Sequence, residues 1–264
     1  MKKIYNFSFK GGVGKSTLTA VEAYELAKKG YKVLVIDMDP QANATDILFA
    51  TFEKKEPKTP LLEGLLKHDL VSSIVKLSDN LYIAPADWDM SLFNVRAAKA
   101  FDSEHKETIL KDELSKIDNN FDFCFIDTPP TLSEITNNAL LASDYVTVVV
   151  QSQAASFNSA VKTVTYYAQM RNDYKVNFKL LGAILYLVNR SSTTDTKVIS
   201  KAHEFFGDSL FQNRIYHRER IKRWSDTGIT DKPNDVWDER THSMYNLVLN
   251  EMLDRAGVKI NDER

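Results

Sequence analysis

Short apolar runs alternate along this chain with segments in which apolar residues recur every three or four positions. Continuous apolar runs are typical of strands buried on both faces, and they predict strands over residues 3–9, 31–37, 81–84, 121–127, 145–150 and 180–188. The helical pattern predicts helices over residues 15–29, 105–117, 133–142 and 155–170. This alternation favours an α/β fold, a mostly parallel twisted sheet flanked by helices. After residue 189 the strand signal fades, and we expect a helical C-terminal part with its clearest helix over residues 241–256.

The composition is that of an ordinary globular protein, with 264 residues of which 43% are hydrophobic and 27% charged, and we expect one domain over residues 1–264. No apolar run reaches the ~18 residues of a membrane span, and the N-terminus has no signal-peptide pattern, so we expect a cytoplasmic protein. The single cysteine, Cys124, excludes an intramolecular disulfide and a thiolate zinc cluster, and its apolar surroundings predict a buried side chain. Because the net charge is -2, any contact with nucleic acid requires a local basic patch.

The glycine-rich segment FKGGVGKST, residues 9–17, lies between the first predicted strand and the first predicted helix. Backbone N–H groups of such a loop, together with the helix N-terminus, can hold the phosphates of ATP. Lys15 can reach the β- and γ-phosphates, and Ser16 offers a hydroxyl to Mg²⁺. The strict P-loop pattern has glycine at position 9, where this chain has Phe9, but the strand–loop–helix context supports the motif. The expected phosphate-binding residues are Gly11, Gly12, Val13, Gly14, Lys15, Ser16 and Thr17.

Carboxylates follow two further predicted strands. Asp37 and Asp39 follow the second strand, and Asp127 follows the apolar run 123–126. Ligands of open parallel sheets bind outside the carboxyl ends of the strands, where these side chains can position water or hold hydrated Mg²⁺. We expect Asp127 to hold the metal through water, with Asp37 as a further possible contributor; an N-cap or a turn before Pro40 is an equally simple role for Asp37.

The segment 10–16, KGGVGKS, resembles the deviant Walker A box of the ParA/MinD superfamily of ATPases, in which the position before the first lysine is often not glycine. The run DMDPQ and the run DTPP, which begins at Asp127, resemble two further boxes of that superfamily, and Asn138, Ala139 and Asp144 match it as well. Gln151 stands where many relatives have proline. The resemblance implies that Lys10 crosses a dimer interface to the partner subunit's ATP and that Asp39 positions the attacking water; a solvated lysine is the simpler alternative for Lys10.

The members of this superfamily differ in function, and the sequence favours some of them. Iron proteins and arsenite pumps need cysteines that this chain lacks, and the C-terminal segment LDRAGVKINDER has neither a tyrosine cluster nor the basic amphipathic pattern of a MinD-like membrane helix. Because the first strand begins near Lys3, we expect no N-terminal helix-turn-helix domain. The chain therefore most resembles the small ParA-type partition ATPases.

The stretch RIYHRERIKR, residues 214–223, has a local net charge of +4 by count, from five Lys or Arg residues and one Glu. The resemblance implies that basic residues in this part bind DNA without reading its sequence, and a solvated helix face with local ion pairs is the alternative. The expected DNA contacts are Arg214, Arg218, Arg220, Lys222 and Arg223. The resemblance also implies that Asn189 and Arg190 lie near the adenine.

The function expected from this resemblance is ATP-dependent DNA partition at the nucleoid. ATP and Mg²⁺ bind between two subunits of a homodimer, the dimer binds DNA nonspecifically, and a ParB-like centromere-binding partner accelerates an otherwise weak hydrolysis. Lys10, Lys15 and Asp39 are the expected catalytic residues. The alternatives are a MinD-like positioning ATPase that acts on a membrane or a polar scaffold, and an amide-forming ligase of the related P-loop enzymes, for whose carboxylate substrate the sequence shows no site.

Overall fold

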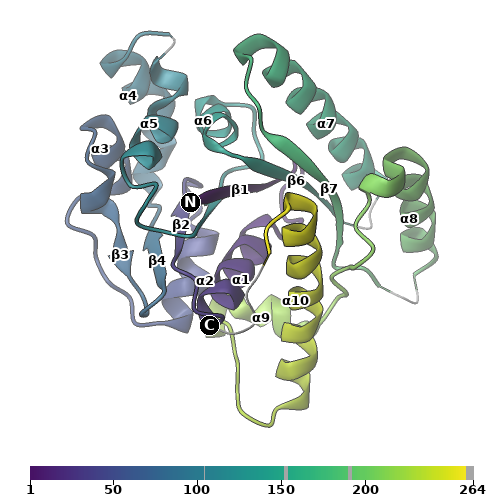
Figure 1. The fold of residues 1–264 in the computed structure, drawn as a ribbon. Helices are drawn as coiled ribbons and strands as arrows, with labels where there is room; N and C mark the ends of the chain where they lie inside the picture. Colours follow the sequence, from purple (N-terminus) through teal and green to yellow (C-terminus); the bar gives the residue numbers. More distant parts are fainter. Residues whose placement is uncertain (104, 152–153, 190–191, 260–264) are drawn as a thin grey trace.

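The computed structural model describes residues 1–103, 105–151, 154–189 and 192–259. Within this part of the chain the strands form a seven-stranded sheet of order β3-β4-β2-β5-β1-β6-β7, parallel except for the pairing of β3 with β4 (Figure 1). The strands are β1 (Lys2–Phe7), β2 (Val33–Asp37), β3 (Val75–Lys76), β4 (Leu81–Ala84), β5 (Phe123–Asp127), β6 (Tyr145–Gln151) and β7 (Lys179–Tyr186). The predicted α/β fold is confirmed, and the short antiparallel β3 was not predicted.

The sheet is covered on both faces, as the continuous apolar runs predict, and successive strand residues belong to two different cores. In β5, Cys124 and Ile126 pack into one core, whereas Phe123 and Phe125 pack into the other. All four side chains are at least 98% buried, so the strand has no solvated face. Such double burial is the reason for the unbroken apolar run of parallel strands. Cys124 is buried, as predicted, and burial raises the pKa of its thiol.

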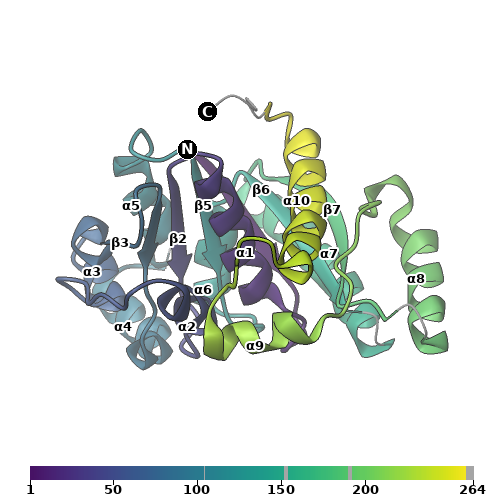
Figure 2. The same cartoon turned by 90° about the horizontal axis from the view of Figure 1, so that it is seen from below.

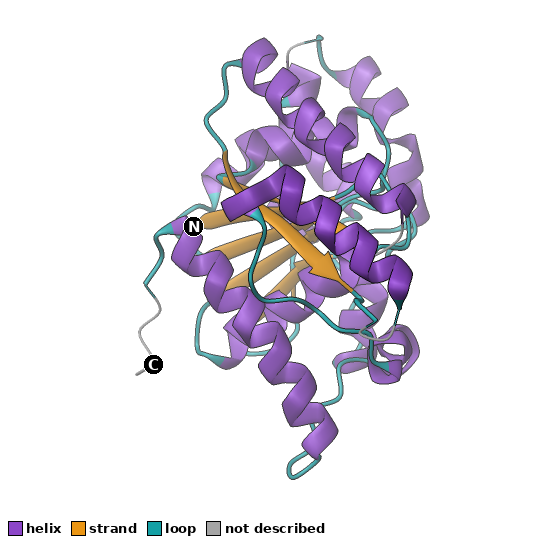
Figure 3. Ribbon diagram, turned by 90° about the vertical axis from the view of Figure 1, so that its right-hand side faces the viewer, coloured by secondary structure: helices purple, strands orange, loops and turns teal. Residues whose placement is uncertain are grey.

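Helices form a layer on each side of the sheet, and Figure 3 shows the strands between them. One core includes residues of α1 (Lys15–Lys28), α2 (Asn43–Thr51), α9 (Glu219–Thr227) and α10 (Val236–Ala256). The other core includes residues of α3 (Leu61–Leu66), α4 (Phe93–Ala100), α5 (Ile109–Lys116), α6 (Glu134–Ala142), α7 (Ala154–Tyr174) and α8 (Thr193–Phe206). The helix predicted over residues 105–117 is a 3₁₀ turn, His105–Glu107, followed by α5.

The C-terminal part is helical, as predicted, and it packs against the N-terminal half of the chain. Helix α10 lies beside α1 in both Figure 1 and Figure 2. Helix α9 packs on α2, and Gly228 at its end has φ 70° and lies so close to α2 that a Cβ there would meet the carbonyl carbon of Ala50 at 2.4 Å. Residues around the basic stretch are thereby fixed next to the segment that follows β2. Among the described residues, every helix is too short or too polar to cross a membrane.

Candidate nucleotide-binding site

The glycine-rich loop lies between β1 and α1, which begins at Lys15. Gly14 precedes the helix with φ 91°, and Gly12 has φ 71°, a region of backbone conformation that favours glycine. A Cβ on Gly14 would lie 2.1 Å from Cε1 of Tyr186, because the tyrosine ring at the end of β7 packs directly against the loop. Both the backbone conformation and this close approach require glycine at position 14.

A pocket of about 400 Å³ opens at this loop, within the range of small-ligand sites. The loop residues that line it include Gly11, Gly12, Gly14, Lys15, Ser16 and Thr17. Asp39, Gln41 and Asn43 line it from the segment after β2, and Pro130 lines it from the segment after β5. The pocket therefore lies at the carboxyl ends of parallel strands, where ligands of such sheets bind. Val13 is fully buried in the core, which leaves only its backbone for a phosphate contact.

Lys15, which lines the pocket, interacts electrostatically with Asp127 and Asp39. Lys15 is only 6% exposed, and burial lowers the pKa of its ammonium group against the opposing charges of Asp127 and Asp39. Asp127 is fully buried, and burial raises its pKa to about 6, although the Lys15 charge and the Ser16 hydroxyl oppose the shift. Neither carboxylate oxygen of Asp127 has a hydrogen bond of ordinary geometry from any described residue. A buried carboxylate that receives no hydrogen bond of ordinary geometry fits a cation or a metal-bound water.

Mg²⁺ fits this arrangement, and Ser16 and Asp127 are the residues that would hold it, Asp127 through water. The described residues include no group of three or more acidic, histidine or cysteine side chains that could hold a metal by themselves. A magnesium ion here would need its remaining ligands from phosphate oxygens and water, as Mg²⁺ commonly does in phosphoryl-transfer sites.

Asp37 and Asp39 differ in their surroundings although they are two residues apart. Asp37 lies beside Asp127 on the neighbouring strand, and both of its oxygens accept hydrogen bonds, from the backbone N–H of Asp39 (3.0 Å) and from the N–H and hydroxyl of Thr45 (2.9 and 2.8 Å). Burial and the Asp127 charge raise the pKa of Asp37. Asp37 thus holds the loop between β2 and α2 in place, in agreement with the turn-forming alternative. Asp39 lines the pocket and accepts a hydrogen bond from the N–H of Gln41 (2.9 Å).

Residues from the end of β7 and from α9, which the sequence did not assign to the nucleotide site, also line the pocket. Tyr186 and Leu187 line it from the end of β7, and Ile221, Lys222 and Ser225 line it from α9. Asn189, expected near adenine, is exposed and donates its N–H to Asp195 (2.7 Å). Arg190 lies outside the described residues. Residues of α9 line the pocket because α9 packs against α2. This packing between distant segments produces no local sequence signal.

The structure divides the basic stretch 214–223 into residues with different roles. Arg220 pairs with Asp235 at 3.3 Å and with the fully buried Asp238. Lys222 pairs with Glu219 at 3.2 Å and lines the nucleotide pocket. Arg220 is therefore part of the structural framework between α9 and α10, whereas Lys222 lines the pocket at the glycine-rich loop.

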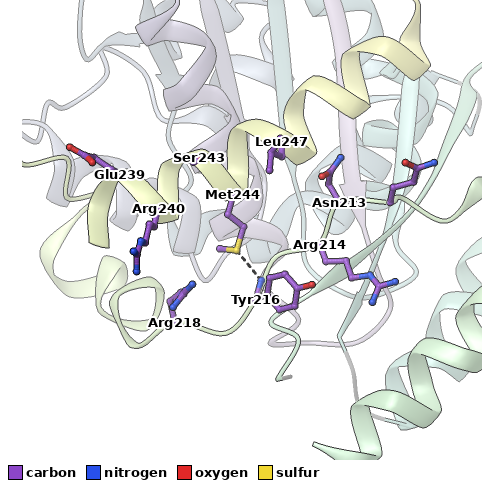
Figure 4. Close-up of a pocket in the computed structure, with 10 residues that line it drawn as sticks. Asn213, Arg214, Tyr216, Arg218, Glu239, Arg240, Ser243, Met244 and Leu247 are labelled. Carbon is purple, nitrogen blue, oxygen red and sulfur yellow. Dashed lines mark hydrogen bonds between the residues drawn. The ribbon is translucent and has the colours of Figure 1, made fainter. Parts of the chain in front are cut away.

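Arg214 and Arg218 belong to a second pocket, of about 500 Å³, between residues 212–218 and α10 (Figure 4). Arg240, on α10, completes a group of three arginines around it and was not predicted. Its guanidinium lies 5.5 Å from the ring of Trp237, a side chain that is 56% exposed. Nε of Arg218 is buried without a hydrogen-bond partner among the described residues. These three arginines form a basic surface, called here the arginine pocket.

A parallel sheet, a glycine loop at the end of β1, a buried lysine and strand-end carboxylates together define a P-loop ATPase. A family model described as an AAA domain matches residues 1–180, and the chain therefore belongs to this family, as a ParA-type member of the ParA/MinD superfamily.

The relatives and similar structures differ in their cellular roles. The sporulation initiation inhibitor protein Soj of Bacillus subtilis is 27% identical over 88% of this chain and 89% of its own length. The maintenance of carboxysome distribution protein A of Synechococcus elongatus is 28% identical over 84% of this chain and 88% of its own. A Borrelia burgdorferi protein described as a plasmid partition protein, crystallised with AMPPNP, is 25% identical with a TM-score of 0.73 over 95% of this chain and 99% of its own.

Proposed function

We propose that this chain is a DNA partition ATPase in which two subunits bind ATP between them. The proposal is based on the two lysines of the glycine-rich loop, of which Lys15 lies in the phosphate site and Lys10 lies outside it. Lys15 faces the pocket, whereas Lys10 is not among the described residues that line it. We assign Lys10, five residues earlier in the same loop, to the nucleotide of a second subunit. The partition and Soj relatives support this assignment.

Hydrolysis in this site depends on electrostatic stabilisation of the transferred phosphoryl group. The loop N–H groups, the N-terminus of α1 and the Lys15 ammonium oppose the charge that develops on the γ-phosphate oxygens. Ser16 and Asp127 would hold Mg²⁺, which would supply further positive charge against the phosphates. Asp39 orients the attacking water, and its hydrogen bond from the Gln41 N–H fixes the carboxylate. We expect slow turnover of the isolated protein, because the described residues that line the pocket include no arginine to complete the charge balance.

DNA binding by the ATP-bound dimer is assigned to the arginine pocket and to the exposed Arg223, not to Arg220 or Lys222. Contacts between arginine and phosphate carry no base information and weaken steeply as salt rises. Replacing Arg214, Arg218 and Arg240 by alanine should abolish retention on DNA at physiological salt and leave ATP binding unchanged. Lys99 and Lys111, which are exposed on α4 and α5, provide a matched control variant. Equal retention of the two variants on DNA would show that the arginine pocket is not part of the DNA interface.

Binding to DNA places the protein at the nucleoid. A ParB-like, centromere-bound partner completes the cycle by accelerating hydrolysis and releasing the dimer from DNA. The Asp39→Ala variant tests the core of this cycle, because a dimer that binds ATP without hydrolysing it should accumulate. Size-exclusion chromatography with ATP and Mg²⁺ should show a stable dimer of Asp39→Ala, and Lys10→Ala combined with it should remain monomeric while still binding ATP. A monomeric Asp39→Ala protein under these conditions would argue against the role of Asp39.

A positioning ATPase for another cargo is the second candidate, and the carboxysome-distribution relative favours it specifically. The two functions use the same nucleotide site and differ in what the ATP-bound form carries or binds. Co-sedimentation of the Asp39→Ala protein with DNA and, separately, with anionic liposomes distinguishes a DNA-bound form from a membrane-bound one. Identification of a small DNA-binding protein encoded next to this chain would favour partition.

A further inference from the structure

A buried histidine lies where the C-terminal helix packs against the phosphate-loop helix, outside the nucleotide site. His242 of α10 is only 5% exposed. Its Nδ1 is hydrogen-bonded to Oε1 of Glu25, a residue of α1 that is 3% exposed. Its Nε2 lies 2.8 Å from the carbonyl oxygen of Thr230, in the segment 228–235 that joins α9 to α10 and is called here the α9–α10 segment. The imidazole ring of α10 is therefore bonded to two other parts of the chain.

Both ring nitrogens of His242 face acceptors, and this geometry indicates its protonation state. A carbonyl oxygen can only accept a hydrogen bond, so Nε2 must carry a proton to bond Thr230. Nδ1 and the Glu25 carboxylate need a second proton between them, and the other carboxylate oxygen accepts a hydrogen bond from the Asn246 amide (2.6 Å). A neutral imidazole beside an ionised carboxylate has one N–H and leaves two acceptors facing each other at the other nitrogen. The contacts therefore require the imidazolium form of the ring.

The charges around His242 balance when the ring is protonated. Two carboxylates face it, Glu25 of α1 and Asp231 of the α9–α10 segment, whose Oδ1 lies 3.8 Å from Nε2. Lys28 of α1 pairs with Asp231, and the Tyr24 hydroxyl donates to the same carboxylate (3.1 Å). Two cations thus match two carboxylates. Removal of the ring proton leaves one negative charge without a partner in a largely buried cluster, which costs free energy.

The same neighbours determine how the ring titrates. Burial lowers the pKa of His242, but its bonds to Glu25 and Thr230 and the charge of Asp231 outweigh burial and raise the pKa above the ordinary value of 6.5. The ion pair therefore contributes fully below about pH 6.5 and is lost as the pH rises through the value in the folded protein. The other charged side chains at this junction pair with one another, Arg220 of α9 with Asp235 and Asp238.

The α9–α10 segment continues directly from a wall of the nucleotide pocket. Three residues of α9 line that pocket, and α9 ends where the segment begins. Beside Thr230, the N–H of Ile229 donates to the Thr51 hydroxyl of α2 (2.7 Å). Helix α1, to which His242 ties the segment, begins at Lys15 in the phosphate loop. The His242 contacts therefore hold the C-terminal end of α9 relative to the helix that follows the phosphate loop.

We propose that His242 is a proton-dependent latch on the nucleotide site. The doubly protonated ring ties the α9–α10 segment to α1 and holds α9 against the pocket, and loss of one ring proton releases the segment and loosens α9. ATP affinity then falls as the pH rises, although the residues of the glycine-rich loop are unchanged. This effect on affinity rests on the proposed ATP site, whereas the protonation state of His242 does not depend on it.

The first experiment follows the ring itself in the nucleotide-free full chain. Long-range ¹H–¹⁵N NMR distinguishes an imidazolium from the two neutral tautomers, and the His242→Gln spectrum identifies the His242 signals among the five histidines. We expect a titration midpoint above 6.5 for His242. Glu25→Gln should lower this midpoint by about one pH unit, since an opposite charge is lost. A midpoint at or below 6.5, or one that Glu25→Gln leaves unchanged, would refute the latch.

The second experiment measures ATP affinity by calorimetry for the wild type and His242→Gln across this pH range. The single amide group of glutamine cannot donate to acceptors on both sides of the ring position, so the latch of the variant is open at every pH. At pH ~6.5 the wild type should bind ATP about fivefold more tightly, as expected for one lost hydrogen bond. About two pH units above the NMR midpoint the two affinities should be equal. His105→Gln, an exposed histidine outside this cluster, is the control and should match the wild type throughout.

Comparing the two proteins at each pH cancels the titration of groups that both share, such as Glu22. An affinity ratio that stays constant with pH, or equal affinities at every pH, would overturn the proposal. Hydrogen exchange gives a readout without nucleotide: at pH ~6.5 the amides of residues 219–231 should exchange about fivefold faster in His242→Gln than in the wild type, and equal rates would also overturn it. If the wild type binds no ATP, the proposed function fails, and NMR and hydrogen exchange still decide whether His242 holds the α9–α10 segment.

Discussion

A structural role and a DNA-binding role of Arg220 predict different results for the Arg220→Ala variant. Its guanidinium contacts Asp238, which is fully buried and also accepts hydrogen bonds from the Thr230 hydroxyl (2.7 Å) and the Lys232 N–H (3.0 Å). Arg220→Ala leaves the Asp238 carboxylate buried without a positive partner. Breaking a buried ion pair from one side costs about 3–5 kcal/mol. Because Arg220 is 26% exposed and two neutral donors remain, we expect the free energy of unfolding to fall by about 2–3 kcal/mol.

Urea unfolding followed by tryptophan fluorescence measures this loss, since Trp224 lies in the same helix. Arg223→Ala, an exposed arginine three residues later, is the control and should change the free energy of unfolding by less than ~0.5 kcal/mol. At a temperature where Arg220→Ala is still folded, its DNA retention should equal that of the wild type. A stability loss below ~0.5 kcal/mol together with a flatter salt dependence of DNA binding would refute the structural role and make Arg220 a phosphate contact.

Three further predictions concern the loop and the core beneath it. Gly14→Ala should abolish ATP binding in calorimetry and lower the free energy of unfolding by about 2–3 kcal/mol, because the alanine would have a positive φ and would clash with Tyr186. Gly12→Ala is the control, since a Cβ at this position has open space around it, and it should cost less than half as much. Burial raises the pKa of Glu22 to about 8, so the wild-type free energy of unfolding should fall as the pH rises from about 4.5 towards about 8. Glu22→Gln removes this penalty and should be more stable than the wild type in urea titrations at pH ~8, with the difference vanishing near pH ~4.5. Asp127→Asn should retain the fold but lose the Mg²⁺ dependence of ATP binding, and an unchanged dependence in metal titrations would contradict its role.

The architecture and the phosphate loop could be predicted from the sequence because their signals are local. A strand buried on both faces shows an unbroken apolar run, and a glycine loop before a helix is read within nine residues, 9–17. The helices α2, α3, α4, α8 and α9 were not predicted individually, and α9, for example, buries only Ile221 and Trp224. The short strand β3 has only two residues and depends on pairing with β4.

The roles of the basic residues could not be predicted because charge counting along the chain ignores partners from distant elements. Arg220 is paired by Asp235 and Asp238, fifteen and eighteen residues later, whereas Arg240 joins Arg214 and Arg218 only through the packing of α10. Likewise, Tyr186 reaches the phosphate loop because β7 ends beside it, 172 residues after Gly14 by number. Tertiary packing, which leaves no short-range pattern, decides these contacts.

Isothermal titration calorimetry with ATP and Mg²⁺ tests the central claim most directly, namely that main-chain amides and Lys15 hold a triphosphate in the pocket beside Asp127. We predict saturable heat with one nucleotide per chain for the wild type and none for Lys15→Ala, with both proteins giving the same circular dichroism spectrum. Equal heats for the two proteins, or no heat for the folded wild type, would contradict it.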